Sequence, residues 1–226
     1  MIVPTDHYPP WRLAENDTDI SGIHIELTDH LLKQLGLKAE YVLRPWSRCL
    51  LMLERGTADI MAGLLKTKER SEYLIYLDPP YSNKDIKAFY VRHGNSGTIK
   101  SYSDLVGMKI GTTLGNSYFP KFDNDTQLQK DPAQNEETCF KKLLYNRIDT
   151  VIISEDTGDY LVNKHGYQGR IEKAEYKYSL PLSVYFAVSK KSPLADRIPE
   201  LEAAMKKMVE SGEVRKMVNN FLKKQN

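Results

Sequence analysis

The sequence is poor in features that would place it in a specialised class of protein. It has only two cysteines among 226 residues, and its 32 basic and 30 acidic side chains leave a formal net charge of +2. No apolar run approaches the roughly 20 residues that span a bilayer, so we expect no integral membrane protein. Because charges of both signs are interspersed, no basic face favours a nucleic-acid partner. The composition is that of an ordinary packed globular protein.

Motifs for catalysis, metal binding and nucleotide binding are also missing. There is no G-x-S-x-G, H-E-x-x-H, G-x-G-x-x-G or Walker spacing. The five histidines are scattered without metal-like pairing, and we expect His24 and His30 to be solvent-facing helix residues. The cysteines match no metal motif and lie in apolar helical patterns, which favours buried thiols. We therefore expect no cofactor, no metal and no enzymatic activity.

Helical and strand patterns alternate along the chain. Ile23, Leu27, Leu31 and Leu35 recur at every fourth position before Gly36, which predicts an amphipathic helix. The next segments are AEYVL, a helix capped by a serine at 47 and ending near 55, and the strand ADIMAG. The alternation restarts near residue 95. It predicts an α/β protein with mainly parallel sheets and helices on both faces, in two similar halves.

Ligands of parallel α/β sheets bind at the carboxyl ends of the strands. The loops YPPW, GLLKTKER and LGNS follow predicted strands, and Ser154 with Glu155 follows the strand TVII. In LGNS, Asn116 or Ser117 would cap a helix that begins near Tyr118, and the N–H groups of that helix start would suit an anion such as a carboxylate. Simple helix capping explains the same residues equally directly.

The segment GLLKTKER has two interpretations. It places three cations and one anion between Lys66 and Arg70, directly after a buried strand. It could be a solvated turn, or an anion site in which one of the cations is held in place.

The order of these segments resembles the family 3 extracellular solute-binding proteins, which are the polar-amino-acid receptors of bacterial ABC importers. The resemblance covers nearly the whole chain. Its most specific part is ADIMAGLLKTKER, with the spacing T-x-x-R after a strand, followed by D-P-x-Y in DPPY.

The resemblance implies a type II periplasmic-binding-protein fold, in which two α/β lobes are joined by two crossing strands. Lobe 1 would comprise residues 1–90 and 186–226, lobe 2 residues 91–185, and KAFYV and VYFAV would be the crossings. The solute would lie between the lobes, which close over it by a hinge.

Several residues match positions that bind the solute in this family. Arg70 matches the arginine that grips the α-carboxylate, a task suited to its planar fork. Ser117 matches a hydroxyl of lobe 2 that meets the same carboxylate, with Asn116 beside it. Lys66 and Lys68 would then be the solvated part of the turn.

Aromatic and backbone contacts complete the expected site. Trp46 matches an aromatic residue that stacks on the solute side chain, and Tyr8 matches one that covers it. Gly63 and Leu65 match positions whose backbone groups reach the amine and the carboxylate. Each of these side chains has an ordinary alternative as a core or loop packing residue.

The sequence departs from the family pattern in two places. Ser154 stands where an aspartate usually pairs with the α-ammonium group, and Glu155 is one residue further on. Leu65 stands where a serine or threonine is common. The solute could therefore lack an α-amine, or Glu155 could meet that amine.

The resemblance implies a monomeric receptor that presents an amino acid or related carboxylate to an ABC permease. We expect a periplasmic or extracellular location, and the sequence given contains no signal segment. The alternatives are the sensing ectodomain of a signalling receptor and, on the same fold, a dehydratase-type enzyme that uses Glu155 or Lys66.

Overall fold

The computed structural model describes residues 1–14, 16, 18–179 and 181–225. They form two compact units: unit 1 holds residues 1–83 and 183–225, and unit 2 holds residues 84–182. Within those described ranges, no helix is both long enough and apolar enough to cross a membrane.

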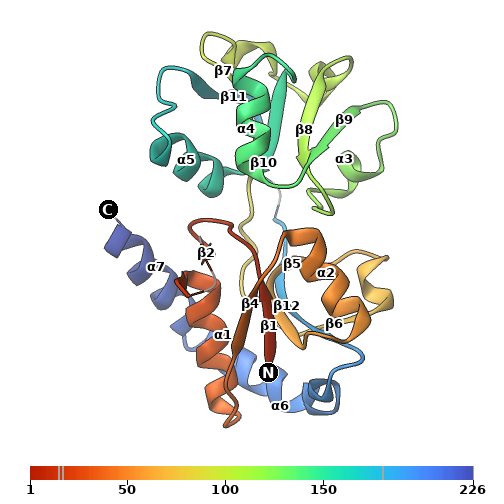
Figure 1. Ribbon diagram of the computed structural model, residues 1–226, viewed down its shortest axis with the longest axis vertical. Coiled ribbons are helices and arrows are strands. Elements are labelled where there is room, and N and C mark those ends of the chain that lie inside the picture. Colours follow the sequence, from red (N-terminus) through yellow and green to blue (C-terminus); the bar gives the residue numbers. More distant parts are fainter. Residues whose placement is uncertain (15, 17, 180, 226) are drawn as a thin grey trace. The chain divides into compact units, whose positions relative to one another are not determined.

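Unit 1 is built on short sheets (Figure 1). Its strands are β1 (Ile2–Thr5), β2 (Leu13–Ala14), β3 (Ile20–Ser21), β4 (Glu40–Leu43), β5 (Ile60–Leu65), β6 (Leu74–Tyr76) and β12 (Val184–Ser189). Its helices are α1 (Ile23–Gln34), α2 (Trp46–Arg55), α6 (Ile198–Glu210) and α7 (Glu213–Gln225), with 3₁₀ turns η1 (Arg70–Glu72) and η4 (Pro193–Arg197). Strand β12 runs antiparallel between β5 and β6, β1 pairs with β4 in parallel, and β2 pairs with β3.

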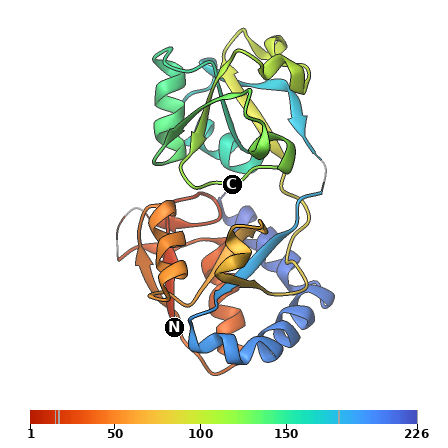
Figure 2. The same ribbon diagram turned by 90° about the vertical axis from the view of Figure 1, so that its right-hand side faces the viewer.

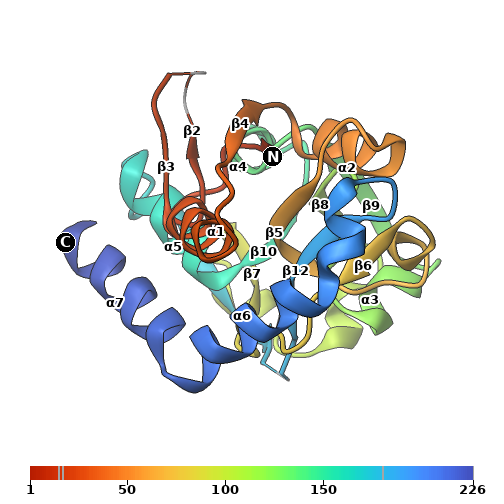
Figure 3. The same cartoon turned by 90° about the horizontal axis from the view of Figure 1, so that it is seen from below.

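The β5–β12–β6 sheet has helices on both faces. Helices α1, α6 and α7 bury one core with Ile60, Ala62 and Phe186, while α2 buries a second core with Met61 and Leu64. Figure 3 shows α1 beside the C-terminal pair α6 and α7, which pack against one another and against α1. The alternating apolar residues of β5 therefore serve two separate cores.

A β-bulge in β5 preserves this division. Ala62 pairs with Phe186, and Leu64 pairs with Tyr185, so Gly63 is the extra residue on the bulged strand. Met61 and Leu64 are three residues apart yet face the same core, which a regular strand does not allow. Gly63 has φ +92°, a backbone conformation that favours glycine.

Unit 2 is a single mixed sheet in the order β11-β7-β10-β8-β9 (Figure 1). Its strands are β7 (Lys87–Arg92), β8 (Lys109–Thr113), β9 (Gln129–Ala133), β10 (Thr150–Ser154) and β11 (Ile171–Tyr178). Its helices are α3 (Pro120–Asn124), α4 (Glu136–Leu144) and α5 (Glu155–Lys164), with 3₁₀ turns η2 (Ser96–Thr98) and η3 (Tyr102–Leu105). Strands β8, β9 and β10 are parallel, whereas β7 is antiparallel to both β10 and β11.

Both faces of the unit 2 sheet are buried. Val151 and Ile153 pack with helices α4 and α5, and Ile152 between them packs in the opposite core with residues of η3 and α3. Figure 2 shows this unit from the side, with α4 and η3 on opposite sides of the sheet. Burial on both faces explains why the segment TVIIS is continuously apolar except at its ends.

The structure corrects several predicted details. The sheets are mixed rather than mainly parallel, because β7 is antiparallel to β10 and β11, and β12 is antiparallel to β5 and β6. Within the units, KAFYV pairs with β10 and β11, and VYFAV pairs with β5 and β6. Helix α2 begins at Trp46 without a side-chain cap, so Ser47 does not cap it.

Candidate functional site

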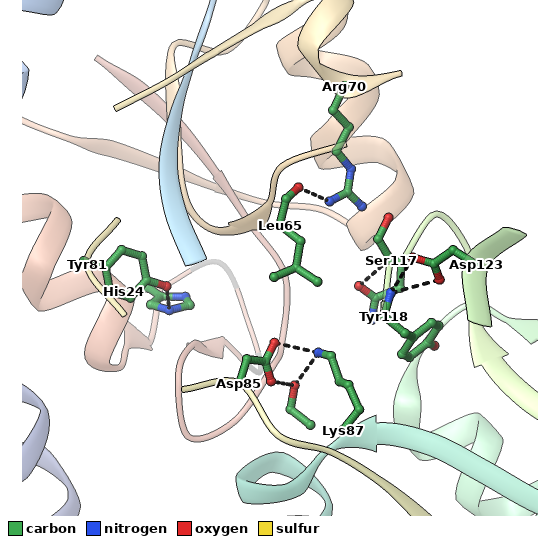
Figure 4. A network of polar contacts seen from close by, with 11 residues as sticks. His24, Leu65, Arg70, Tyr81, Asp85, Lys87, Ser117, Tyr118 and Asp123 are labelled. Atoms are coloured by element: carbon green, nitrogen blue, oxygen red, sulfur yellow. Dashed lines mark hydrogen bonds and ion pairs between the residues drawn. The ribbon is translucent and has the colours of Figure 1, made fainter. Parts of the chain in front are cut away.

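Arg70 is a buried cation at the start of η1. Its side chain follows the turn after β5, and the residue is 4% exposed. Its Nη1 donates to the carbonyl oxygen of Leu65 at 3.1 Å (Figure 4). Its Cζ lies 5.6 Å from the ring centroid of Trp46. Its backbone N–H donates to Thr67 Oγ1 at 3.2 Å. These contacts fix the guanidinium rather than leave it in solvent.

The other two cations of GLLKTKER lie on the surface. Lys66 and Lys68 are exposed, and Lys66 Nζ is 5.7 Å from the ring centroid of Tyr76. The hydroxyl of Tyr76 donates to the same Leu65 carbonyl at 3.1 Å. Burial raises the pKa of Tyr76 to about 12, with Arg70 acting against that rise. The basic segment thus combines one buried cation with two in a solvated turn.

Trp46 and Tyr8 share a second guanidinium, that of Arg12. Trp46 opens helix α2 and is 6% exposed, while Tyr8 is half-buried. The Cζ of Arg12 lies 5.0 Å from the ring centroid of Tyr8 and 5.3 Å from that of Trp46. The two aromatic rings that the sequence predicts to contact a solute therefore also contact a cation of the chain itself.

Arg12 is held by polar groups beneath these rings. Its Nε lies 2.7 Å from a carboxylate oxygen of Asp6, and both residues are buried. Its Nη1 lies 2.9 Å from His24 Nδ1 and donates to the carbonyl oxygen of Ala62 at 3.3 Å. Burial is the largest single influence on the pKa of Arg12 and would lower it, but the contacts with Asp6, Tyr8 and Cys49 together outweigh burial and raise that pKa.

His24 is buried, which corrects the prediction that it faces solvent. Arginine can only donate hydrogen bonds, so His24 Nδ1 accepts from Arg12 and its proton lies on Nε2, 2.7 Å from the hydroxyl of Tyr81 (Figure 4). Burial and the nearby Arg12 charge hold the pKa of His24 well below its usual value. From the sequence, His24 is expected on the solvent-facing side of its helix, and only its contacts with Arg12 and Tyr81 show that it is buried.

Gly63 lies against this same group. A Cβ atom at Gly63 would be 2.5 Å from His24 Cε1 and 2.7 Å from Arg12 Nη1. The absence of a side chain therefore makes room for the buried arginine and histidine. In unit 1, Tyr8, Trp46 and Gly63 thus lie against Arg12. Trp46 also lies beside Arg70, which donates to the carbonyl oxygen of Leu65.

In unit 2, the loop with Asn116 and Ser117 does not start a helix. Helix α3 begins at Pro120 and is only five residues long, so the predicted capping by Asn116 or Ser117 is wrong. The Oδ1 of Asn116 accepts from the backbone N–H of Ser117 at 3.1 Å. The next N–H, of Tyr118, donates to both carboxylate oxygens of Asp123 at 3.0 and 3.1 Å (Figure 4). An anion of the chain itself thus meets an N–H group of this loop.

Ser154 lies in a buried charged cluster with Asp85 and Lys87. Its hydroxyl donates to Asp85 Oδ1 at 2.7 Å and accepts from Lys87 Nζ at 2.8 Å. Lys87 Nζ also pairs with Asp85 Oδ2 at 2.7 Å and lies 5.8 Å from the ring centroid of Tyr118 (Figure 4). The lysine charge at the first position of β7 is therefore matched by an adjacent carboxylate.

Glu155 turns to different partners from its neighbour Ser154. Its Oε1 lies 3.0 Å from Lys173 Nζ and 3.3 Å from Lys177 Nζ, both on β11. Although partial burial opposes the shift, these lysines hold the pKa of Glu155 below its usual value. The carboxylate is thus engaged by two ammonium groups of its own unit.

Sequence reasoning missed Arg12, His24, Asp85 and Lys87. Arg12 directly follows YPPW, and Lys87 opens the strand KAFYV as an odd charge in an apolar run, so each left a weak signal. Asp85 left none, because its partner Ser154 is 69 residues away. Across the part of the chain that the structure describes, no group of three or more histidines, cysteines or carboxylates is arranged to hold a metal ion.

Comparison with known proteins connects this arrangement to one family. The family described as "Bacterial extracellular solute-binding proteins, family 3" matches residues 1–224. A curated relative, the L-cystine-binding protein TcyJ of Escherichia coli (strain K12), is 27% identical over 158 residues, covering 70% of this chain and 59% of that protein. A probable histidine-binding protein of Campylobacter jejuni is 25% identical, covering 67% of this chain and 58% of its own length. The chain thus spans about three fifths of these relatives.

Solved structures confirm the predicted fold. An ancestral arginine-binding protein bound to arginine is similar with a TM-score of 0.82 and 23% identity, covering 97% of this chain and 96% of its own. A histidine kinase sensor domain with similarity to periplasmic binding proteins has a TM-score of 0.83 at 16% identity, covering 98% and 95%. The chain therefore has the α/β fold of the periplasmic binding proteins.

Proposed function

Since the chain belongs to the bacterial extracellular solute-binding proteins of family 3, we propose that it captures a small carboxylate-bearing solute, most simply an amino acid, for an ABC importer. The matched family and relatives are binding proteins, not enzymes. The family is extracellular, and a periplasmic or extracellular location is part of the proposal. A permease of the importer would be the partner that receives the solute.

The observation that carries the proposal is the fixed guanidinium of Arg70. Its bond to the Leu65 carbonyl and its position beside Trp46 orient a planar fork, which matches a carboxylate in two parallel hydrogen bonds. Burial strengthens such a charge-assisted bond, because little water competes for it. The solute carboxylate is therefore assigned to Arg70.

The class of solute is supported by the relatives. They are named for binding L-cystine and, as a probable assignment, histidine, and a structural neighbour holds arginine. These solutes share the α-amino-acid group and differ in their side chains. A carboxylate clamp at Arg70 would bind the carboxylate of this shared group, so amino acids are the first class of solute to test for this chain.

The two residues nearest to the expected ammonium site are engaged by charged groups of the chain itself. Ser154 bridges Asp85 and Lys87, whose charges offset one another, and Glu155 is paired with two lysines. This arrangement supports a carboxylate clamp more than an ammonium clamp. Each amino acid should accordingly be tested beside the 2-hydroxy acid that lacks its amine.

A thermal-unfolding screen tests the proposal. A solute at about 100 times its dissociation constant stabilises the folded state by about 2.7 kcal/mol, which raises the melting temperature of a chain of this size by roughly 5–10 °C. Amino acids and their 2-hydroxy acids form the panel, and the Lys68→Ala protein, altered at an exposed cation of the same turn, serves as the matched control. If no member of the panel raises the melting temperature, the proposal is wrong.

The lobe ranges 1–90 with 186–226 and 91–185, and lobe closure on binding, remain predictions. Small-angle X-ray scattering with and without the stabilising solute measures closure as a fall in the radius of gyration. The monomeric state is measured in the same experiment from the forward scattering.

A further inference from the structure

The rings of Tyr8 and Trp46 already have a cationic neighbour. Aromatic faces attract cations, and a solute with a positively charged side chain would be recognised by such a contact. In this chain the Arg12 guanidinium makes that contact, at 5.0 Å from the Tyr8 centroid and 5.3 Å from the Trp46 centroid. Trp46 also has Arg70 at 5.6 Å. Two guanidinium groups of the protein therefore lie beside one aromatic ring.

Arg12 is built into this position. The ion pair with Asp6, the bond to the Ala62 carbonyl and the contact with His24 Nδ1 hold the guanidinium on several sides. The residue is 4% exposed, and the Cβ-less Gly63 packs directly against it. Moving Arg12 aside for a solute would break these contacts and leave the buried Asp6 carboxylate without its ion pair, which is costly.

We propose that Arg12 determines specificity: it occupies the aromatic pair in place of a cationic solute side chain and restricts the solutes to those with neutral or anionic side chains. This inference rests on the proposed function, because it concerns the side chain of the same solute that Arg70 holds by its carboxylate. A second ammonium or guanidinium group would approach like charges in surroundings with little water, where repulsion is strong. A neutral or anionic group meets no such repulsion.

Pairs of amino acids that differ in charge but hardly in shape test this inference on the unaltered protein. Suitable pairs are 2,4-diaminobutyrate with homoserine and arginine with citrulline, measured by calorimetric titration at pH 7. We expect the neutral member of any pair that binds to do so about tenfold or more tightly than the cationic member. Equal or tighter binding of the cationic member overturns the inference while leaving the proposed function intact.

A result in which none of these amino acids binds has a different meaning. If no member binds, Tyr8 and Trp46 do not form a subsite for an amino-acid side chain, and the inference is overturned. If the thermal screen of amino acids and 2-hydroxy acids also gives no shift, the proposed function fails with it. The two failures are therefore distinguishable.

A charge-removing variant tests the role of Arg12 itself. Asp6→Asn combined with Arg12→Met removes both members of the buried ion pair, so that neither charge is left alone. We expect the preference for the neutral member to fall by about tenfold. A merely structural effect would weaken both members equally and leave their ratio unchanged, which would refute the assignment.

The matched control is Arg55→Met, which removes an exposed arginine from the last turn of α2. Its ratio of affinities should equal that of the unaltered protein. If the Asp6→Asn, Arg12→Met protein does not fold, as judged by the loss of a cooperative unfolding transition, the charge preference of the unaltered protein still decides the inference.

Discussion

Substitution of Gly63 by alanine should destabilise unit 1 for two separate reasons. The residue has φ +92°, which an L side chain rarely adopts, and its Cβ would lie 2.5 Å from His24 Cε1 and 2.7 Å from Arg12 Nη1. Both neighbours are buried and held by polar contacts, so neither can move aside without breaking them. Alanine therefore forces a shift of the arginine and histidine as well as of its own backbone.

The two costs can be estimated separately. A left-handed backbone conformation costs a non-glycine residue about 1–2 kcal/mol, and forcing extra volume into a packed interior costs about 1–3 kcal/mol. The sum, roughly 2–5 kcal/mol, is a large part of the usual stability of a folded protein. It corresponds to a fall in melting temperature of about 5–20 °C for a chain of this size.

Gly36 provides the matched control for this estimate. It has φ +71°, and nothing lies within 4 Å of its Cβ position, so Gly36→Ala has the backbone cost alone. Urea unfolding of both variants should show Gly63→Ala to be the less stable by about 1–3 kcal/mol. Equal stabilities would refute the claim that Gly63 makes room for Arg12 and His24.

The buried polar groups give further predictions. Because the pKa of His24 is lowered in the folded state, the unfolded state binds an extra proton below about pH 6.5, and stability should fall there by up to about 1.4 kcal/mol per pH unit. Urea unfolding at a series of pH values should show that the stability of the His24→Gln protein depends less steeply on pH. An unchanged dependence on pH would contradict this. Lys87→Met should lower the free energy of unfolding by roughly 1–3 kcal/mol, because it leaves the Asp85 carboxylate without its ion pair. The loss should be smaller when Lys87→Met is combined with Asp85→Asn. Thermal unfolding of both variants measures the difference, and additive losses would count against the ion pair. Burial raises the pKa of Cys49 and of Cys139, so both thiols should resist a disulfide reagent until the protein unfolds, and rapid labelling of the native protein would argue against their burial.

Local patterns predicted those parts of the fold in which burial and periodicity agree. The strands ADIMAG, KAFYV and TVIIS and the helix from Ile23 were recognisable because their apolar residues face cores. Strands β9 and β11 were not predicted, since QKDPA and IEKAEYKY are rich in charged residues and their pairing is decided by neighbouring strands. The start of α3 at Pro120 follows from proline at the first turn, a signal that the prediction overlooked in favour of Ser117.

The burial of residues in the candidate site was predictable where a motif marked them, and unpredictable where only tertiary contacts determine it. Arg70 follows a strand at a recognisable spacing, and the structure holds it beside Trp46. The Asp6–Arg12–His24 contacts join a strand end, a loop and a helix, and no local pattern specifies them. The pairing of Ser154 with Asp85 is of the same kind.

The central claim is that Arg70 grips the carboxylate of a small solute, and calorimetric titration of the Arg70→Ala protein tests it most directly. The titrant is the amino acid or 2-hydroxy acid that most raises the melting temperature of the unaltered protein, and Lys68→Ala is titrated beside it. Loss of a buried charge-assisted clamp should weaken binding by about 100-fold or more, with the Lys68→Ala protein unaffected. An Arg70→Ala protein that folds and binds the solute with unchanged affinity would contradict the account.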